Sequence, residues 1–308
     1  MKESYENQEL IVPEGNDEFL SIQWFPGHMA KTRRKLKESL PMVDVVAEIC
    51  DARIPLASRN PELAEITGGK PRIVLLNKSD MADVRATRQW QRVIEQNGDK
   101  PLVIDCKTGK GLNAFGAAAA SLMKEKLDRL SQRGVKHRAV RVMVVGIPNV
   151  GKSTFINKLC GSSAKVENRP GVTRNNQWYR SKDGAVEFLD TPGVLWPKFE
   201  DKAVGEHLAF TGAVRDAILD SEMLATRLLD CIMKLNKGYE KLFAARYKLS
   251  EEQLGFYPAE LLHAIGRNRG MIIRGGDVDI ERASNMLLEE FKNIKIGPIT
   301  LEWAEDHA

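Results

Sequence analysis

The stretch Gly146-Ile147-Pro148-Asn149-Val150-Gly151-Lys152-Ser153 decides the fold, because it matches the pattern G-x-x-x-x-G-K-[ST] without a gap. An apolar, β-branched run at 140–145 precedes it, and a helical pattern starts at Thr154. Strand, loop and helix in that order form the context in which this pattern binds nucleotide phosphates. A chance match in a glycine-rich loop would not require such flanks. The stretch therefore predicts a phosphate-binding loop in an α/β domain.

The side chains of this loop have separate predicted tasks. The glycines let the backbone approach the phosphates, and a helix N-terminus faces the anion. Lys152 would reach the β- and γ-phosphates, while the Ser153 hydroxyl would bind Mg²⁺. The residues expected to contact nucleotide here are Asn149, Val150, Gly151, Lys152, Ser153 and Thr154.

Length and composition describe an ordinary globular protein. The chain has 308 residues, 43% hydrophobic and 29% charged, enough for two domains. No apolar run approaches the ~18 residues of a membrane span, and the acidic N-terminus resembles neither a signal nor a transit peptide. The four cysteines are scattered, without a C-x-x-C pair. We therefore expect free thiols, a cytoplasmic location and no membrane partner.

Three short apolar runs before the phosphate loop alternate with helical patterns. The runs are 43–51, 71–76 and 101–104, and a helix around Trp90 separates the last two. This alternation predicts a mostly parallel sheet with helices on both faces. A single further helix is expected over 112–130. A basic connector follows it, and Gly134 breaks the helix.

Asn77-Lys78-Ser79-Asp80 follows the second of these runs and fits N-K-x-D, a pattern that recognises guanine. Guanine presents N1–H and N2–H₂ side by side, and the Asp80 carboxylate can accept both. Adenine lacks both donors and would leave the carboxylate unpaired, so we expect guanine to be preferred over adenine by ~10⁴-fold. Asn77 would tie this loop to a neighbouring one, and the stem of Lys78 would lie along the purine. We expect all four residues to line the nucleotide site.

Asp105-Cys106-Lys107 ends the next strand, at the place of the last guanine loop, usually S-A-K. The backbone N–H of Cys106 can bond guanine O6 whatever its side chain. Asp105 departs from the usual small residue. An ordinary turn at the strand end therefore stays open as the alternative.

Two segments after the phosphate loop are candidate switches. Thr173 lies in a loop rich in glycine and proline and would sense the γ-phosphate and Mg²⁺. Asp190 begins D-x-x-G at 190–193 and would hold a water on Mg²⁺, while the Gly193 N–H would meet the γ-phosphate. The expected metal ligands are therefore Ser153, Thr173 and, through water, Asp190.

The order of these elements is rotated, because the guanine loops precede the phosphate loop instead of following it. A parallel sheet tolerates such circular permutation. The chain resembles the circularly permuted GTPases of the YlqF/RbgA (ribosome biogenesis GTPase A) family. The stretches that carry the resemblance are WFPGHM (24–29), DARIP (51–55), NKSD (77–80), GIPNVGKST (146–154), PGVT (170–173) and DTPGVLWP (190–197).

The resemblance implies an extension at 1–20, a permuted GTPase domain at 21–200 and a helical, RNA- or ribosome-binding domain at 201–308. Helical spacing at 223–235 and 286–291 supports the last. Because the permutation puts D-x-x-G next to this domain, contacts of 190–193 with the γ-phosphate would set its orientation.

Position 194, where many GTPases carry a water-orienting glutamine, is valine, so intrinsic hydrolysis should be slow. His28 is the candidate catalytic residue, by its chemistry and by the resemblance. A histidine that only caps or packs is the alternative. The resemblance also implies K⁺ at Asn149.

The expected function is a monomeric GTPase, with GTP/GDP and Mg²⁺, that assembles the large ribosomal subunit by contacting rRNA and ribosomal proteins. Basic segments at 31–37, 124–141 and 263–274 would face the rRNA, although a basic helix at 31–37 is equally typical of a solvated surface. The alternative is a nucleotide-gated signalling switch acting on a protein partner. A metabolic kinase is disfavoured by the guanine loop.

Overall fold

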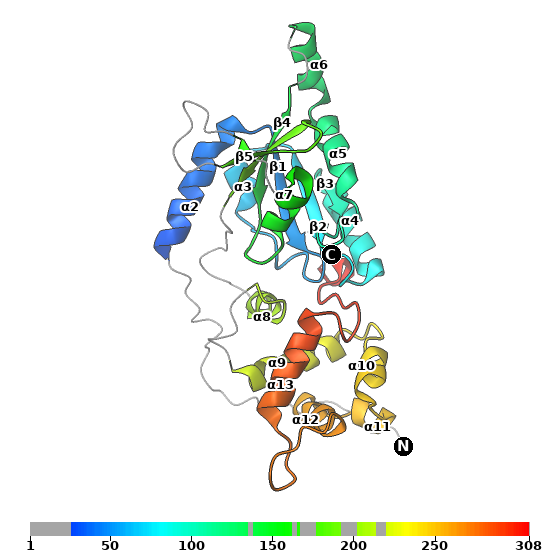
Figure 1. Cartoon of the computed structure of the whole chain (residues 1–308). Coiled ribbons are helices and arrows are strands. Elements are labelled where there is room, and N and C mark those ends of the chain that lie inside the picture. The colour runs from blue at the N-terminus through cyan, green and yellow to red at the C-terminus, as the bar shows by residue number, and fades with distance from the viewer. Residues whose placement is uncertain are drawn as a thin grey trace.

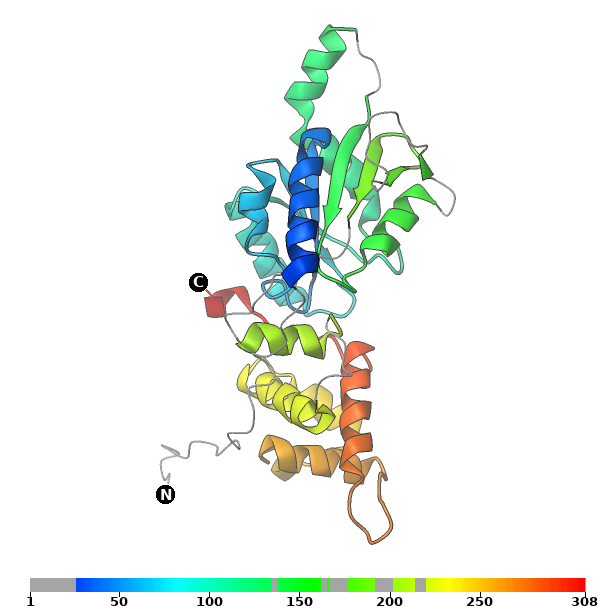
Figure 2. The same ribbon diagram turned by 90° about the vertical axis from the view of Figure 1, so that its left-hand side faces the viewer.

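The computed structural model describes residues 26–134, 138–161, 165–166, 177–191, 202–213 and 220–307, with side chains described for all of these except 26–32 and 165–166. An α/β domain and a smaller helical domain lie end to end (Figure 1). Both views show the second domain below one edge of the sheet (Figure 2). Thr173, Gly193 and the extension at 1–20 lie outside the described residues.

The α/β domain contains a seven-stranded sheet in the order β3-β2-β1-β4-β7-β6-β5. Strands β1 to β4 and β7 are mutually parallel, whereas β5 and β6 run antiparallel to their neighbours. The mostly parallel sheet that the sequence predicts is thus confirmed. The strands are β1 (Val45–Asp51), β2 (Arg72–Asn77), β3 (Lys100–Val103), β4 (Val140–Val145), β5 (Lys165–Val166), β6 (Trp178–Arg180) and β7 (Val186–Asp190).

Helices cover both faces of the sheet, and the side chains of the central strand β1 alternate between them. Val45 and Ile49 pack in one cluster with residues of α5 (Phe115–Leu122) and α7 (Lys152–Cys160). Val46 packs with α2 (Pro26–Ser39) and α3 (Leu63–Thr67), and Cys50 with α4 (Val84–Gln96). Apolar residues on both faces explain why the strands read as continuous apolar runs.

α2 is described from Pro26 onward. Another helix differs from the expectation. The helix expected over 112–130 is divided at Met123 (φ −108°, ψ 8°) into α5 and α6 (Lys124–Gln132), after a short 3₁₀ turn at Leu112–Ala114. No residue of α6 is buried, and it projects beyond the sheet (Figure 1).

The helical domain packs around α9, α12 and α13, whose buried leucines form its core. Asp220 and Asp279 accept backbone N–H groups at the starts of α9 and α13, as side chains at this position do. The helical spacing predicted here is confirmed. Its helices are α8 (Lys202–Phe210), α9 (Ser221–Lys234), α10 (Glu240–Tyr247), α11 (Glu251–Leu254), α12 (Pro258–Asn268) and α13 (Ile280–Lys292).

After α13 the chain returns to the α/β domain and packs beside α4, ending in a 3₁₀ turn at Ala304–His307 (Figure 1). The Ile299 N–H donates to Met81 O at 3.1 Å and the Leu301 N–H to Arg53 O at 2.8 Å. The Trp90 indole donates to Glu302 O at 2.9 Å. The two domains are therefore connected by backbone pairing as well as by covalent chain. Within the described part of the chain, no helix combines the length and the apolar character needed to cross a membrane.

Candidate nucleotide-binding site

The phosphate loop joins β4 to α7, as predicted, and two of its glycines are required by close backbone approaches. Gly146 has φ +153°, and a Cβ there would lie 2.5 Å from Ile49 O. Gly151 has φ +103°, and its Cβ would lie 2.5 Å from the Nδ2 of Asn77. Any larger residue would have to displace backbone or a buried amide. The loop is therefore fixed against the ends of β1 and β2.

Asn77 connects the three loops of the site. It is 3% exposed at the end of β2. Its Nδ2 donates to Val150 O at 2.6 Å, and its Oδ1 accepts the Cys106 N–H at 2.9 Å. The sequence predicts that Asn77 ties the base loop to a neighbour, and the structure shows that it ties two.

Lys152 is buried, and its ammonium donates to the loop carbonyls of Gly146 (3.0 Å) and Ile147 (2.7 Å). Burial lowers the pKa of Lys152 to about 8, against the negative charge of Asp190, which raises it. Burial also raises the pKa of Asp190, although Lys152 opposes this. Two opposite charges that burial disfavours are typical of a site that a charged ligand completes.

Ser153, at the start of α7, is exposed, and Asp190 is half-buried at the end of β7. A hydroxyl and a carboxylate are hard oxygen donors of the kind Mg²⁺ takes, together with phosphate oxygens and water. No group of three or more His, Cys, Asp or Glu that could hold a metal occurs among the residues searched in the structure. The donor set therefore fits Mg²⁺ held jointly with a nucleotide.

In the guanine loop, Asp80 is exposed and Lys78 has φ +59°. The Ser79 N–H donates to Ile104 O at 3.3 Å, which joins this loop to the end of β3. The Lys78 ammonium lies 2.9 Å from the Oδ2 of Asp51. The sequence predicts only that the stem of Lys78 lies along a purine. The ion pair that anchors its ammonium to Asp51, at the end of β1, was not predicted.

Asp105 and Cys106, predicted to contact the nucleotide, both have hydrogen-bond partners within the protein. Asp105 is 3% exposed, and its carboxylate accepts the N–H groups of Lys107 and Thr108 and the Thr108 hydroxyl. It thus stabilises its own turn. The Cys106 N–H already donates to Asn77. A bond from this N–H to guanine O6 would have to share or replace that contact.

Asn149 faces the helical domain in the structure. It has φ +60°, and its Nδ2 donates to Gly212 O at 2.8 Å, just after α8. The guanidinium of Arg53 donates to the neighbouring carbonyl of Thr211 at 3.4 Å. The phosphate loop is therefore bonded directly to the end of α8.

Beneath the site lies a buried charged network whose residues were not predicted as site residues. Asp51 and Arg53 are each 2% exposed and form an ion pair at 2.8 Å. Arg53 and Lys78 hold the pKa of Asp51 well below its usual range, against burial, which raises it. The position of Asp51 at a strand end, next to predicted ligand loops, was the available signal.

Glu302 extends this junction from the other end of the chain. Its carboxylate accepts the Leu56 N–H at 2.5 Å and the Ala57 N–H at 3.1 Å. It also lies 2.8 Å from the Nδ1 of His207 on α8. Burial lowers the pKa of His207, but Cys231 and Glu302 outweigh it and raise the pKa to about 10. We call Asp51, Arg53, His207 and Glu302 the junction cluster.

The predicted catalytic His28 lies in α2, and its side chain is outside the described set. The valine at 194 also falls outside it. The structure therefore brings together Asn77, Lys78, Cys106, Val150, Gly151 and Lys152, with Asn149 on the side of the helical domain.

The family model described as "50S ribosome-binding GTPase" matches residues 141–245, starting in the strand before the phosphate loop. "Ribosome biogenesis GTPase A" of Priestia megaterium is 47% identical over 92% of this chain and 97% of its own length. The Bacillus cereus protein of the same name is 46% identical over 92% and 95%. The GDP-bound structure of YlqF is 27% identical, covers 89% of this chain and all of its own, and superposes with a TM-score of 0.64.

Proposed function

The chain belongs to the ribosome biogenesis GTPase A family and is a GTP-hydrolysing enzyme, and from this we propose that it matures the large (50S) ribosomal subunit late in assembly. It would bind the unfinished particle in the GTP state and leave after hydrolysis. The observation that supports nucleotide binding is the pair of hydrogen bonds by which Asn77 joins Val150 to Cys106. Binding to the ribosomal particle is supported by the names of the relatives.

Basic, exposed groups support RNA as part of the partner surface. Arg34 on α2 and Arg129 on the projecting α6 have side chains 75% and 71% exposed. Their visible ion pairs are surface pairs with nearby glutamates on the same helix, which contribute little and exchange readily for phosphate. Such contacts make binding weaken steeply with salt.

We propose that the nucleotide state reaches the helical domain through α8. This helix follows the D-x-x-G segment along the chain, and its end is bonded to Asn149 of the phosphate loop and to Arg53. A γ-phosphate that moves the segment after Asp190 would therefore pull on α8. Small-angle scattering curves should differ between the GDP and the non-hydrolysable GTP states. Superimposable curves would refute this coupling.

Catalysis would be slow in the free protein and stimulated by the particle. We propose that His28 supplies the group that position 194 lacks, as a proton acceptor or donor near neutral pH. His28→Ala should remove particle-stimulated turnover without changing nucleotide affinity. If stimulated turnover survives, His28 only packs or caps.

The proposed ions are Mg²⁺ at Ser153, Thr173 and Asp190, and K⁺ at Asn149. The Nδ2 of Asn149 is bonded to Gly212 O, so its Oδ1 is the atom left for a cation. Equal turnover in K⁺ and Na⁺ would contradict this. We further propose a cytoplasmic monomer, in keeping with a factor that works on ribosomal particles.

Gradient fractionation at low and high salt tests the proposed function. The protein should migrate with large-subunit particles when bound to a non-hydrolysable GTP analogue, and the association should be lost with GDP or at high salt. Migration with a ribosome-free protein complex in a salt-insensitive way would favour a signalling switch instead.

A further inference from the structure

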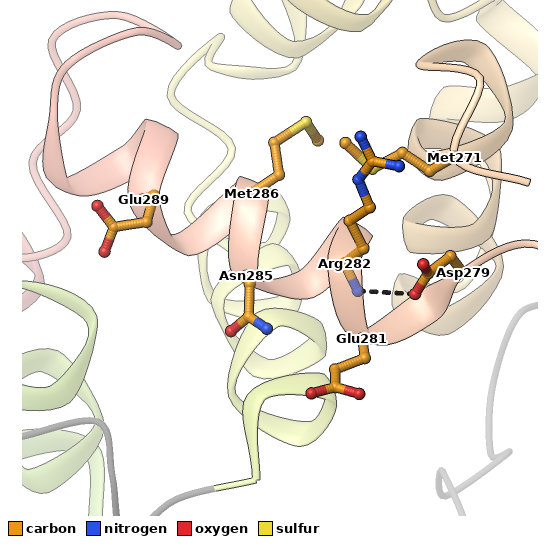
Figure 3. A pocket seen from close by; sticks show the side chains of 7 residues that line it. All are labelled: Met271, Asp279, Glu281, Arg282, Asn285, Met286 and Glu289. Carbon is orange, nitrogen blue, oxygen red and sulfur yellow. Dashed lines mark hydrogen bonds between the residues drawn. The ribbon is translucent and has the colours of Figure 1, made fainter.

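A groove lies on the helical domain, at the hairpin that joins α12 to α13, far from the nucleotide site (Figures 1 and 3). Its volume is about 540 Å³. The hairpin closes through a bridge between Ile272 and Val278 and a bond from the Ile273 N–H to Asp277 O at 2.9 Å. Met271 and Asp279, at the two ends of the hairpin, line the groove together with residues of α13 (Figure 3).

Two of the side chains that line the groove are apolar, Met271 beside the hairpin and Met286 on α13. Beside it, Ile272 and Ile273 are 45% and 49% exposed. Methionine adapts its shape to different side chains, and large apolar side chains exposed together mark interaction surfaces. The groove therefore offers an adaptable apolar surface.

The rim of the groove is acidic. Asp279, Glu281 and Glu289 supply three carboxylates against the single guanidinium of Arg282. Asp279 is partly used, since it accepts the Arg282 backbone N–H at 3.1 Å. Glu289 is 64% exposed, with Lys292 at 3.7 Å, and Glu281 is exposed without an ion pair among the described residues. The free charge of this rim is therefore negative.

We propose that this groove binds a basic, extended polypeptide segment whose apolar side chain enters between Met271 and Met286. The acidic rim would pair with lysines or arginines on either side of that side chain. An RNA backbone would meet carboxylates here, and like charges brought together cost affinity. The same domain has Arg267 and Arg274 exposed on α12 and the hairpin for nucleic acid. The inference rests on the proposed function in that a ribosomal particle would present both kinds of partner.

The test uses the full chain and three fluorescent probes, with binding followed by anisotropy. The probes are a ten-residue peptide of alternating lysine and leucine, the same peptide with glutamate for lysine, and a short RNA hairpin. The lysine peptide should bind, and Glu281→Gln with Glu289→Gln should weaken it at least tenfold. The RNA affinity should stay the same or rise.

A second variant guards against damage to the fold. Asn285 lies on the groove face of α13 (Figure 3), four residues from both glutamates. Asn285→Lys would therefore add favourable i,i+4 pairs while placing a positive charge in the groove. It should weaken the lysine peptide as the double variant does. The matched control for the double variant is Glu251→Gln with Glu252→Gln on exposed sites of α11. It changes the net charge by the same amount as the double variant and should not affect binding of the lysine peptide.

The proposal is overturned if the groove variants bind the lysine peptide like the parent, if the control weakens it equally, or if the groove variants lose RNA instead. Sedimentation of the parent protein with large-subunit particles is measured in parallel and reports on the proposed function alone. Peptide binding that depends on the groove supports this inference even where sedimentation fails.

Discussion

The nucleotide-binding loops and the junction cluster lie at the same edge of the sheet, yet their charged groups differ in how completely they are paired. In the loops, Lys152 donates to carbonyls of its own loop, and the exposed Asp80 has no hydrogen bond or ion pair within the described structure. In the junction cluster, each carboxylate is saturated. Asp51 accepts from Arg53 and Lys78, and Glu302 accepts two backbone N–H groups and faces His207.

This difference in pairing separates residues that recognise the nucleotide from residues that attach the helical domain. Groups without strong partners can gain them from a ligand, so we expect the loops to respond to the nucleotide. The carboxylates of the junction cluster already have their partners, and a buried ion pair is costly to break from one side, so we expect this cluster to attach the helical domain to the α/β domain. Lys78 belongs to both, because it lies in the guanine loop and pairs with Asp51.

The largest expected effect breaks recognition and leaves attachment intact. Asp80→Asn replaces the acceptor for guanine N1–H and N2–H₂ by an amide, which should lower the preference for guanine by about 10⁴-fold. Xanthine carries a carbonyl at C2 and suits the amide, so XDP should gain on GDP in competition against a fluorescent guanine nucleotide. Since Asp80 is exposed, unfolding in urea should shift by less than about 0.5 kcal/mol. Unchanged base preference would remove Asp80 from the site.

The next effect breaks attachment. Glu302→Gln leaves the charged His207 buried without its carboxylate, and losing one partner of a buried pair costs about 3–5 kcal/mol. The free energy of unfolding should fall by that amount in urea titrations. Glu305→Gln is the matched control, because Glu305 is 50% exposed and pairs with Lys237 at the surface, where the cost is below about 1 kcal/mol. Equal effects of the two changes would show that the junction cluster is no stronger than a surface pair.

Asn77 tests whether the two guanine loops and the phosphate loop act as one unit. Asn77→Ala removes two hydrogen bonds and leaves the buried Cys106 N–H without its acceptor, which should cost about 2–4 kcal/mol. We expect weaker GDP binding in calorimetry, together with lower stability. Asn285→Ala, at an exposed position on α13 of the helical domain, is the control and should change little. Full GDP affinity in Asn77→Ala would mean that the loops are positioned independently.

The sequence predicts the parts of the site that are local and misses those that join distant segments. Apolar runs end at Asn77, Gly146 and Asp190, so the strands and their loops are legible from spacing alone. The pairing of Lys78 with Asp51 spans two strands, and the contact of Glu302 with Leu56 joins residues 246 apart. No periodicity encodes such contacts, because the first depends on which strands are neighbours in the sheet and the second on where the segment after α13 packs.

Prediction from the local sequence pattern also fails where tertiary packing decides whether a helix continues or ends. Met123 lies inside a good helical pattern, yet the helix is interrupted there. The buried side chain of Met123 anchors the end of α5, and beyond it α6 buries no residue. Among the described residues, only the partly buried Leu127 and the ion pair of Lys126 with Asp44 tie α6 to the domain, so little opposes the break.

The smallest expected effect is a pH dependence of GDP affinity that arises from Lys152 in the phosphate loop and not from the junction cluster. Burial lowers the pKa of Lys152 to about 8, so in the free protein its ammonium is lost as the pH rises above that value. Phosphates favour the ammonium and raise its pKa in the complex, so binding then takes up a proton. GDP affinity should be flat below pH 8 and fall towards about tenfold per unit above it.

The junction cluster follows a different curve, which serves as the control for the pH prediction. The pKa of His207 is raised to about 10, above its unfolded value of ~6.5. Its stabilising effect is therefore complete below pH 6.5 and is lost as the pH rises through about 10. Between pH 8 and 9, unfolding and GDP affinity should both change, but Glu302→Gln should remove only the His207 part of the stability change and leave the affinity profile intact. A flat GDP affinity up to pH 9 would mean that the nucleotide does not draw on the charge of Lys152, and the contrast between the poised loops and the saturated junction cluster would then fail.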